Sequence, residues 1–393
     1  MHDRSKEKRG SVVVIVMITL LFATFALVTF MEKASVDLLV EQREVVSRRL
    51  RIEAYSALET TLAVLEAFRD AGQGLRGPAE GWGDPLGFVG YTPGEGRTVE
   101  IAFEDESGKI SLPRADAQTL IRLFENWGIT QADAEGLADA FMGWMKRDHV
   151  YNTSVRPQYD SGQLPFEAPL RSLRSFAELA AIEKVREMFY DADGRPNEYW
   201  KRFAESVSLI DFQRSNLNGA TPDTLAALGR FNEQQRNDIG DHLQGKGSGG
   251  TGSPTVLQSP NDVHRITGTS GELPGFGVTI SALRIVVTVR EGRSEFRMAT
   301  VVGPQGSAAK TVQETATSTK KETSSASAKT SQQQQNRPDA SKAATPPPAR
   351  GGSQQPNQPG TPGQGLKYPF TLLEIRENDE IPSAPTPPPA QSP

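Results

Sequence analysis

Oxygen-bearing side chains between residues 190 and 198 are the strongest candidates for chemistry in this 393-residue chain. In the segment YDADGRPNEYW, Asp191, Asp193 and Asn197 stand beside a glycine, an arrangement that lets a backbone curl around a hard cation such as calcium. The full spacing of an EF-hand loop and its distant glutamate are missing. The competing interpretation is an ordinary turn in which an aspartate accepts hydrogen bonds from nearby amides.

Residues for acid–base or nucleophilic catalysis are scarce. The chain has no cysteine and four histidines, which excludes disulfides, thiolate metal sites and thiol nucleophiles. His149 follows Asp148, but no candidate nucleophile or phosphate-binding loop accompanies this pair. The adjacent acids at 104–106 have the pattern of a solvated turn. We therefore predict that the protein is not an enzyme.

Charge and length restrict the class of protein further. Lys and Arg total 43 against 48 Asp and Glu, and this net charge of -5 argues against nucleic acid as a partner. A chain of this length is too long for one compact core, so we expect two or more domains with linkers.

An uncharged segment near the N-terminus is long enough to span a bilayer. Residues 1–10 carry four basic and two acidic side chains, and the 21 residues 11–31 carry no charge. As a helix this segment would span about 31 Å, the thickness of a hydrocarbon core. Helix-forming sequence follows it instead of a small-residue cleavage site, so we predict that the segment is retained. The basic flank predicts a single-pass membrane protein with its N-terminus cytoplasmic and the bulk of the chain extracytoplasmic.

The helical pattern continues past the membrane segment. Apolar residues recur at three- and four-residue steps as far as Phe68, and no Pro or Gly interrupts residues 11–71. This predicts one helix of about 60 residues, divided into a transmembrane part at 11–31 and an amphipathic spine at 32–71. Gly72 and Gly74 are expected to end it. On this pattern alone, a signal anchor leading into a coiled-coil stalk is an equal alternative.

The remaining chain predicts an α+β fold. Strand-like alternation at 72–112 and 246–302 predicts an antiparallel sheet, with a hairpin turning at 291–294. Between these parts, residues 113–245 carry helical periodicity and N-cap residues, which predict an all-α inserted domain. The N-caps are Thr130, Ser175 and Thr221.

The C-terminal 91 residues, 303–393, are mostly of low complexity. Residues 303–366 contain almost no large apolar side chain, so their composition predicts a disordered loop. Residues 367–377 are apolar and predict a last edge strand, with a short sticky motif in a disordered tail as the alternative. A Pro-rich tail at 378–393 ends the chain.

The junction between leader and membrane segment resembles the processing site of type IV prepilins. Lys8, Arg9 and Gly10 directly precede the apolar run, and the peptidase of that family cuts after such a glycine. The resemblance implies cleavage between Gly10 and Ser11. Most members carry Glu at the fifth mature position, where its carboxylate can neutralise a neighbour's terminal amine in lipid. Here that position is Ile15.

Three further segments resemble the K-type minor pseudopilins of type II secretion systems, which lack this Glu. Residues 99–112, VEIAFEDESGKISL, are similar to the family's Asp-x-x-Gly-Lys-Ile-Asn segment. Residues 141–148 are similar to its Trp-x-Asp-x-Asp helix end, with Lys146 in place of the first Asp. Residues 215–228, SNLNGATPDTLAAL, are similar to its Asn-x-Asn-x-Ala motif. The resemblance covers most of 1–302 and implies a pilin-like long N-terminal helix and antiparallel sheet, with a large all-α insertion.

The resemblance also implies a location, a function and partners. It implies that the membrane is the inner membrane and that the C-terminal region is periplasmic. We expect a minor pseudopilin at the tip of the secretion pseudopilus, which initiates assembly and supports protein export across the outer membrane. Its expected partners are the I- and J-type minor pseudopilins, the major pseudopilin, the prepilin peptidase, the inner-membrane assembly platform and membrane lipid. The helical insertion is expected to contact exported substrates or the secretin. No cofactor other than calcium is expected.

Some expectations remain open at this point. K-type relatives can bind calcium in their helical domain, which adds Asp148 and Asp160 as weaker candidate ligands. One alternative function is an unprocessed, single-pass anchored periplasmic scaffold or binding protein. Another is a minor pilin of a related type IV pilus-like machine, and a third, weaker one is an anchored hydrolase.

Overall fold

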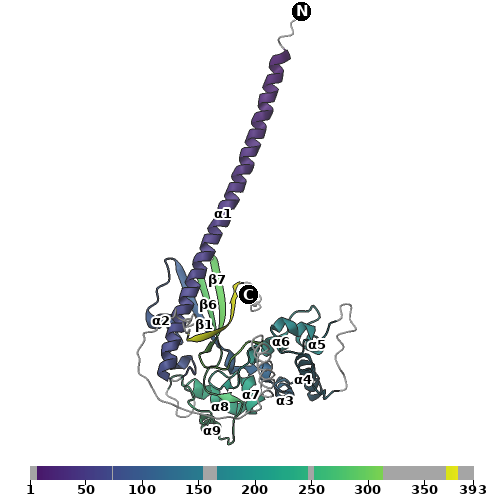
Figure 1. Cartoon of the computed structure of the whole chain (residues 1–393), viewed down its shortest axis with the longest axis vertical. Helices are drawn as coiled ribbons and strands as arrows, with labels where there is room; N and C mark the ends of the chain where they lie inside the picture. Colours follow the sequence, from purple (N-terminus) through teal and green to yellow (C-terminus); the bar gives the residue numbers. More distant parts are fainter. Residues whose placement is uncertain (1–6, 73, 154–165, 247–251, 313–368, 379–393) are drawn as a thin grey trace, which may run out of the picture.

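The computed structural model describes residues 7–72, 74–153, 166–246, 252–312 and 369–378. Helix α1 (Glu7–Gly72) runs for 66 residues, and its N-terminal part stands clear of the rest of the molecule (Figure 1). It ends where the two glycines predict. Gly74 adopts φ 140°, and its amide donates to the carbonyl of Arg69. The predicted membrane segment and spine therefore form one continuous helix.

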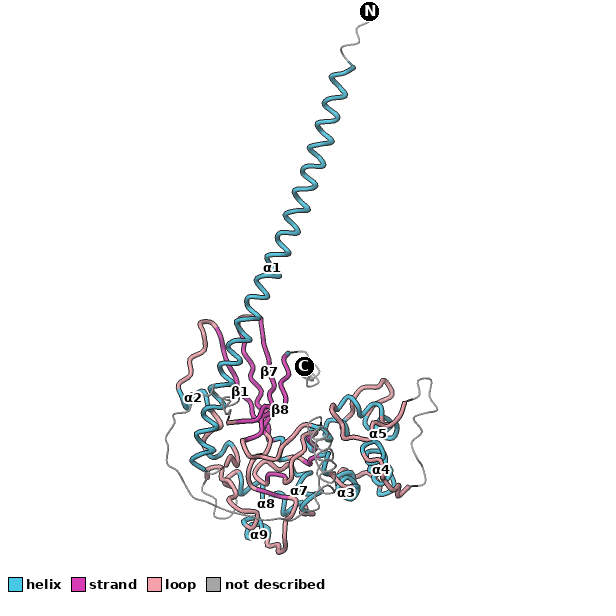
Figure 2. The backbone as a smooth tube through the Cα atoms, viewed as in Figure 1, coloured by secondary structure: helices cyan, strands magenta, loops and turns pink. Residues whose placement is uncertain are grey.

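A four-stranded antiparallel sheet lies along the C-terminal part of α1 (Figure 2). Its strands are β1 (Arg97–Asp105), β6 (Leu283–Glu291), β7 (Ser294–Pro304) and β8 (Phe370–Glu377), in the order β1-β6-β7-β8. Gly292 has φ 58° in the turn from β6 to β7, which is the predicted hairpin. Because β8 pairs with β7, the predicted last edge strand is confirmed.

The core between α1 and the sheet begins where the helix ceases to be exposed. Leu50, Leu58, Leu62 and Leu65 lie on one face of α1, and they are buried with side chains of β6 and β7. Burying each leucine contributes about 1.5–3 kcal/mol, so this face fixes the helix to the sheet. Helix α2 (Pro85–Val89) covers α1 on another side, where Phe88 meets Phe68 edge to face.

Most of the other helices follow β1 and precede β6 in sequence, and they form a lobe beyond the sheet (Figure 1). They are α3 (Ala117–Asn126), α4 (Gln131–Met145), α5 (Glu183–Phe189), α6 (Glu198–Ser206), α7 (Pro222–Gly229), α8 (Glu233–Leu243) and α9 (Asp262–Thr267). The predicted N-caps Thr130, Ser175 and Thr221 each accept a hydrogen bond from a backbone amide of the first turn. The helix after Ser175 is a 3-10 helix.

An aromatic core holds α3, α4, α5 and α6 together. The rings of Phe124, Phe141 and Phe203 stack, and Phe189 packs on all three. All four side chains are fully buried. A fully buried aromatic ring contributes several kcal/mol to stability, so this cluster accounts for the cohesion of the lobe.

Short parallel pairings and 3-10 helices connect the lobe to the sheet. β2 (Ile110–Ser111) pairs with β3 (Val207–Ser208), and β4 (Ser215–Asn216) pairs with β5 (Phe276–Gly277). The 3-10 helices are Pro78–Glu80, Glu106–Gly108, Leu112–Arg114 and Phe176–Ala181.

Two boundaries differ from those predicted. The helical part continues past residue 245, because Val263 of α9 shares a buried core with Ile239 of α8. Residues 303–312 were predicted to be disordered, but the structure places them against the body. Lys310 pairs with Asp211 through the backbone, and Ala309 is buried. The rest of that prediction, 313–366, lies outside the described residues, as do the leader residues 1–6 and the tail from 379 onward.

Candidate functional site

The predicted membrane segment presents apolar side chains on every side. All described side chains from Val12 to Met31 are exposed, and in the described ranges α1 is the one helix long and apolar enough to cross a bilayer. Thr19, Thr24 and Thr29 donate to carbonyls one turn back, so their hydroxyls need no other partner in lipid.

The predicted processing site lies at the start of the same helix. Gly10 and Ser11 belong to the first turns of α1, and 58% of the Ile15 surface is exposed. Cleavage between Gly10 and Ser11 stays a prediction. An exposed apolar residue at position 15 suits a helix surface in lipid or against another apolar helix.

A buried carboxylate fixes α1 to the edge of the sheet. Glu53 lies on the packed face of α1; it accepts hydrogen bonds from the Tyr91 hydroxyl at 2.6 Å and from Arg97 Nη1 at 2.5 Å. Burial and the hydrogen bond to Glu53 raise the pKa of Tyr91 to about 12. The sequence could have indicated this contact, because Glu53 is a charged residue on the otherwise apolar face of the predicted helix.

The last strand is held by the other flank of the same helix. Tyr55 and Arg51 of α1 donate to Glu377 Oε1 at 2.8 and 3.0 Å. Arg69 donates to the carbonyl of Pro369, and its guanidinium lies 5.9 Å from the ring centroid of the buried Phe370. β8 therefore connects the sheet to the spine directly.

Two of the segments that predicted the fold meet at the junction between sheet and lobe. Asn216 donates through Nδ2 to Asp105 Oδ2 at 2.7 Å and to the carbonyl of Arg76 at 2.9 Å. Asp105 Oδ1 accepts from the amide and hydroxyl of Ser107. Burial raises the pKa of Asp105 to about 6, although these hydrogen bonds favour its charged form. A Cβ on Gly108 would overlap the carbonyl oxygen of Gly219, so the two segments touch through bare backbone.

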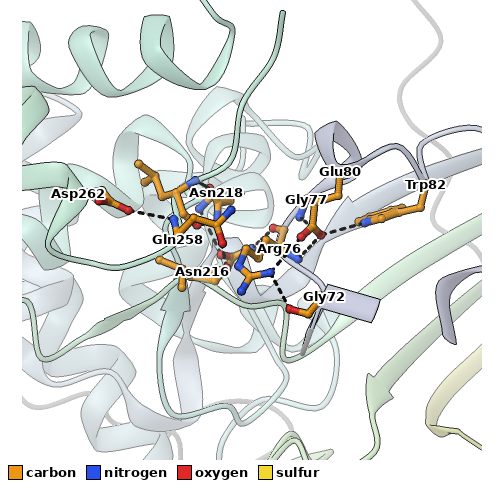
Figure 3. Close-up of polar contacts among 11 residues, drawn as sticks. Gly72, Arg76, Gly77, Glu80, Trp82, Asn216, Asn218, Gln258 and Asp262 are labelled. Atoms are coloured by element: carbon orange, nitrogen blue, oxygen red, sulfur yellow. Dashed lines mark hydrogen bonds and ion pairs between the residues drawn. The ribbon is translucent and has the colours of Figure 1, made fainter. Parts of the chain in front are cut away.

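The polar contacts of the junction extend from the end of α1 to α9 (Figure 3). Glu80 accepts from the backbone amide of Arg76 at 2.7 Å and from Trp82 Nε1 at 3.3 Å. Asn218 accepts from the amide of Leu257 and donates to the carbonyl of Val278. Both asparagines of the predicted Asn-x-Asn motif therefore bond backbone from distant parts of the chain. The junction therefore links the spine, the sheet and the lobe through a continuous set of partly buried hydrogen bonds.

A second polar cluster, which the sequence did not predict, holds the loop that follows α4. Asp139 is 1% exposed; its Oδ1 lies 2.9 Å from His149 Nε2, and its Oδ2 accepts from the amide and hydroxyl of Thr153. Burial alone would raise the pKa of Asp139, but hydrogen bonds from the amides of Thr153 and Asn152 hold it below its usual value. His149 thus pairs with Asp139 instead of the adjacent Asp148. Because the amide and the hydroxyl of Thr153 both donate to the Asp139 carboxylate, the cluster holds the loop after α4 against that helix.

The candidate calcium ligands do not converge. Asp191 Oδ1 accepts from the amides of Asp193 and Arg195 at 3.0 and 2.8 Å, and Asn197 caps α6. Asp148 is exposed, and Asp160 lies outside the described residues. Within the described ranges, no three acidic or histidine side chains group as metal ligands. The geometry fits the turn interpretation, and a calcium site here stays a prediction without a matching ligand set.

The substituted position in the resembling segment 141–148 has a different role. Lys146 stands where the family has Asp, and its Nζ donates to the carbonyl of Ala115 at 3.4 Å. A cation in this place cannot ligate a metal, and it instead links the end of α4 to the start of the lobe.

Comparisons with known proteins agree in family and fold. Residues 104–192 match the family model described as type II secretion system (T2SS), protein K. No curated protein sequence matches the chain. A solved structure described as the GspK-GspI-GspJ complex from the type 2 secretion system of enterotoxigenic Escherichia coli contains a chain that matches with a TM-score of 0.50 and 13% identity. The match covers 68% of this chain and 94% of that chain, and at this identity it shows the fold.

Proposed function

This chain belongs to the protein K family of type II secretion systems, and on that basis we propose that it is the minor pseudopilin at the tip of the secretion pseudopilus. The observation that carries the proposal is the topology. A helical lobe enters between β1 and β6, two neighbouring strands of a sheet that lies on a long apolar-tipped helix. A rod with an anchored body suits side-by-side assembly, and the lobe makes the body too bulky for another subunit to stack on it.

The N-terminal rod supports an anchor in the inner membrane. The basic flank at residues 1–10 favours a cytoplasmic N-terminus, with the sheet and lobe in the periplasm. The chain has no cysteine, so Ser294→Cys in the exposed β6–β7 turn provides a single label site. In this topology, a membrane-impermeant maleimide labels that variant without disruption of the inner membrane. Labelling only after disruption would reverse the orientation.

The partners follow from the same premise. The solved complex contains GspK with GspI and GspJ, and we propose that I- and J-type minor pseudopilins pack against α1 of this chain. The major pseudopilin, the peptidase and the assembly platform complete the proposed partners. Proteins of this kind act by assembly, and we propose no enzymatic activity.

Ile15 supports the tip position. In a filament, a carboxylate at this position would neutralise the terminal amine of the subunit ahead, and a tip subunit has no subunit ahead. An unpaired carboxylate in the membrane costs about 2.5–3.5 kcal/mol at the centre of a span. Ile15 avoids this cost.

The test is restoration of secretion in cells that lack this chain. The wild-type chain and Ile15→Leu should both restore export of the secreted proteins, whereas Ile15→Glu should reduce it at equal membrane abundance. If the wild-type chain restores no secretion, the proposed function is wrong. If Ile15→Glu matches Ile15→Leu, the tip argument is wrong while the family remains.

A further inference from the structure

An arginine-lined cavity lies between α3 and the α7–α8 turn. Its volume is about 760 Å³, and Arg122, Arg230 and Arg236 contribute the cations of its lining. These helices lie at the end of the molecule farthest from the N-terminus (Figure 1). The cavity therefore opens in the part of the protein most distant from the membrane.

Among the described residues, none of the three guanidinium groups forms a close ion pair with an acid, although Asp116 and Glu125 lie near enough to Arg122 to favour its charged form. In the described ranges, many arginines form ion pairs within 4 Å, such as Arg97 with Glu53, but none of these three does. Arg122 instead donates to the carbonyl of Ala227, and Arg236 donates to Asn126. Burial, followed by repulsion from Arg230, lowers the pKa of Arg122. Three arginines against two carboxylates, Glu125 and Glu233, give the lining a positive balance, which attracts a negatively charged ligand.

The backbone conformation of Arg230 is a second observation that indicates a function for this side chain. This residue caps the C-terminus of α7 at φ 55° and ψ 27°, a left-handed conformation that glycine adopts at lower cost. Its amide donates to the carbonyl of Ala226, a contact that a glycine would keep. A bulky residue held in a sparsely populated conformation is a reason to look for a function of its side chain. Here that side chain lines the cavity.

We propose that this cavity binds an acidic peptide segment of a partner protein in the periplasm, through carboxylates paired with Arg230 and Arg236. Guanidinium groups bind carboxylates in a bidentate geometry, and the volume accommodates several residues of an extended chain. Glu125 and Glu233 also line the cavity, so it suits separated carboxylates better than a dense polyanion. The net charge of -5 disfavours nucleic acid in addition.

The location of the partner rests on the proposed function, whereas the binding itself does not. At the tip of a pseudopilus, the end farthest from the membrane would meet exported proteins or the channel before any other part. A failure of peptide binding would overturn this site and leave anchoring and secretion data untouched, so the two proposals fail separately.

The test uses the full chain in an uncharged detergent with fluorescein-labelled Gly-Glu-Gly-Glu-Gly-Glu-Gly, and with the same peptide carrying Gln in place of Glu. The key variant is Arg230→Gly, which removes the guanidinium and relieves the backbone, so its melting temperature should equal or exceed that of the wild type. The matched control is Arg293→Gly in the exposed β6–β7 turn, which changes the net charge equally.

The wild type and Arg293→Gly should bind the Glu peptide better than the Gln peptide, and added salt should weaken that binding. Arg230→Gly should bind the Glu peptide about tenfold more weakly, the loss expected for one charge-assisted pair. Arg236→Gln should weaken it in the same sense. Equal affinity of the wild type for both peptides would overturn the proposal, as would equal affinity of Arg230→Gly and Arg293→Gly for the Glu peptide.

Discussion

The side-chain amide of Asn216 donates a 2.7 Å hydrogen bond to the half-buried carboxylate of Asp105, a residue 111 positions earlier in the chain. This bond joins the end of β1 to the end of β4, the short strand that precedes α7, and the same amide also donates to the carbonyl of Arg76 after α1. One asparagine therefore connects the spine, the sheet and the lobe.

Asn216→Ala should destabilise the protein through this junction. The change removes both hydrogen bonds and leaves a half-buried carboxylate oxygen and a half-buried carbonyl without their donor, at a cost of about 2–4 kcal/mol. Urea unfolding of the full chain in detergent, followed by tryptophan fluorescence, measures the free energy of unfolding. The control is Asn237→Ala on the exposed face of α8, which should change it by less than about 0.5 kcal/mol. Equal effects of the two substitutions would show that the hydrogen bonds of Asn216 do not stabilise the protein.

Asp105 should make stability depend on pH in the opposite sense to most acids. Burial raises its pKa in the folded state to about 6, above the ordinary value of 3.8 for an aspartate, so between these values the folded state binds more protons than the unfolded state. The stabilising contribution is present below about pH 4 and is lost as the pH rises through about 6, a change of order 3 kcal/mol.

The measurement compares the wild type with Asp105→Asn, which cannot ionise at this position. The free energy of unfolding of the wild type minus that of Asp105→Asn should fall between about pH 4 and about pH 6.5 and should be nearly constant above about pH 7. Acids with lowered pKa values, such as Asp139 and Asp223, lose stability as the pH falls in both proteins and cancel in the difference. A difference that is constant across this range would show that Asp105 does not titrate in it.

Phe370 should be the residue that holds β8 in the sheet. Its side chain is buried against α1 and β7, and Phe370→Ala should lower the free energy of unfolding by about 3–5 kcal/mol. Leu372 lies two residues further along the same strand and is 45% exposed, so Leu372→Ala is the matched control and should cost less than about 1 kcal/mol. A neutral Phe370→Ala would mean that the strand is not docked in solution.

Calcium should have little effect on this chain. Asp191 is committed to a turn and Lys146 stands in place of an acid, so the lobe presents no matching ligand set in its described part. Calcium at about 100 times a dissociation constant would stabilise a binding protein by about 2.7 kcal/mol, which shifts the melting temperature by several degrees. We expect melting temperatures within about 1 °C of each other in millimolar calcium and in excess chelator. A calcium-dependent rise that Asp191→Asn abolishes would restore the calcium interpretation.

The sequence predicted the parts of the fold that depend on local periodicity. The leucine spacing from Leu50 to Leu65 marked the buried face of α1, and the alternation of Val99, Ile101 and Phe103 marked β1. Residues 303–312 were predicted to be disordered because composition alone does not reveal the backbone pairing of Lys310 with Asp211.

The polar clusters could not be predicted in the same way. Asp105 and Asn216 are adjacent only after the lobe has folded, and no periodic signal joins positions 111 residues apart. Asp139 gave a weak signal, because it is the one acid in the otherwise apolar second half of α4, residues 137–145, but its partners lie in an irregular loop. The cavity between α3 and α8 was likewise invisible, because its three arginines come from separate helices and turns.

We propose that the leader is removed and that the rest of α1 stays with the protein as a membrane-spanning helix. The most direct test is mass spectrometry of the N-terminus of the full-length protein extracted from membranes of cells that contain the peptidase. We expect a mature chain that begins at Ser11 and keeps residues 11–31. An intact or Met-trimmed N-terminus would contradict processing, and a native protein released into the periplasm without residues 11–31 would contradict the rod itself.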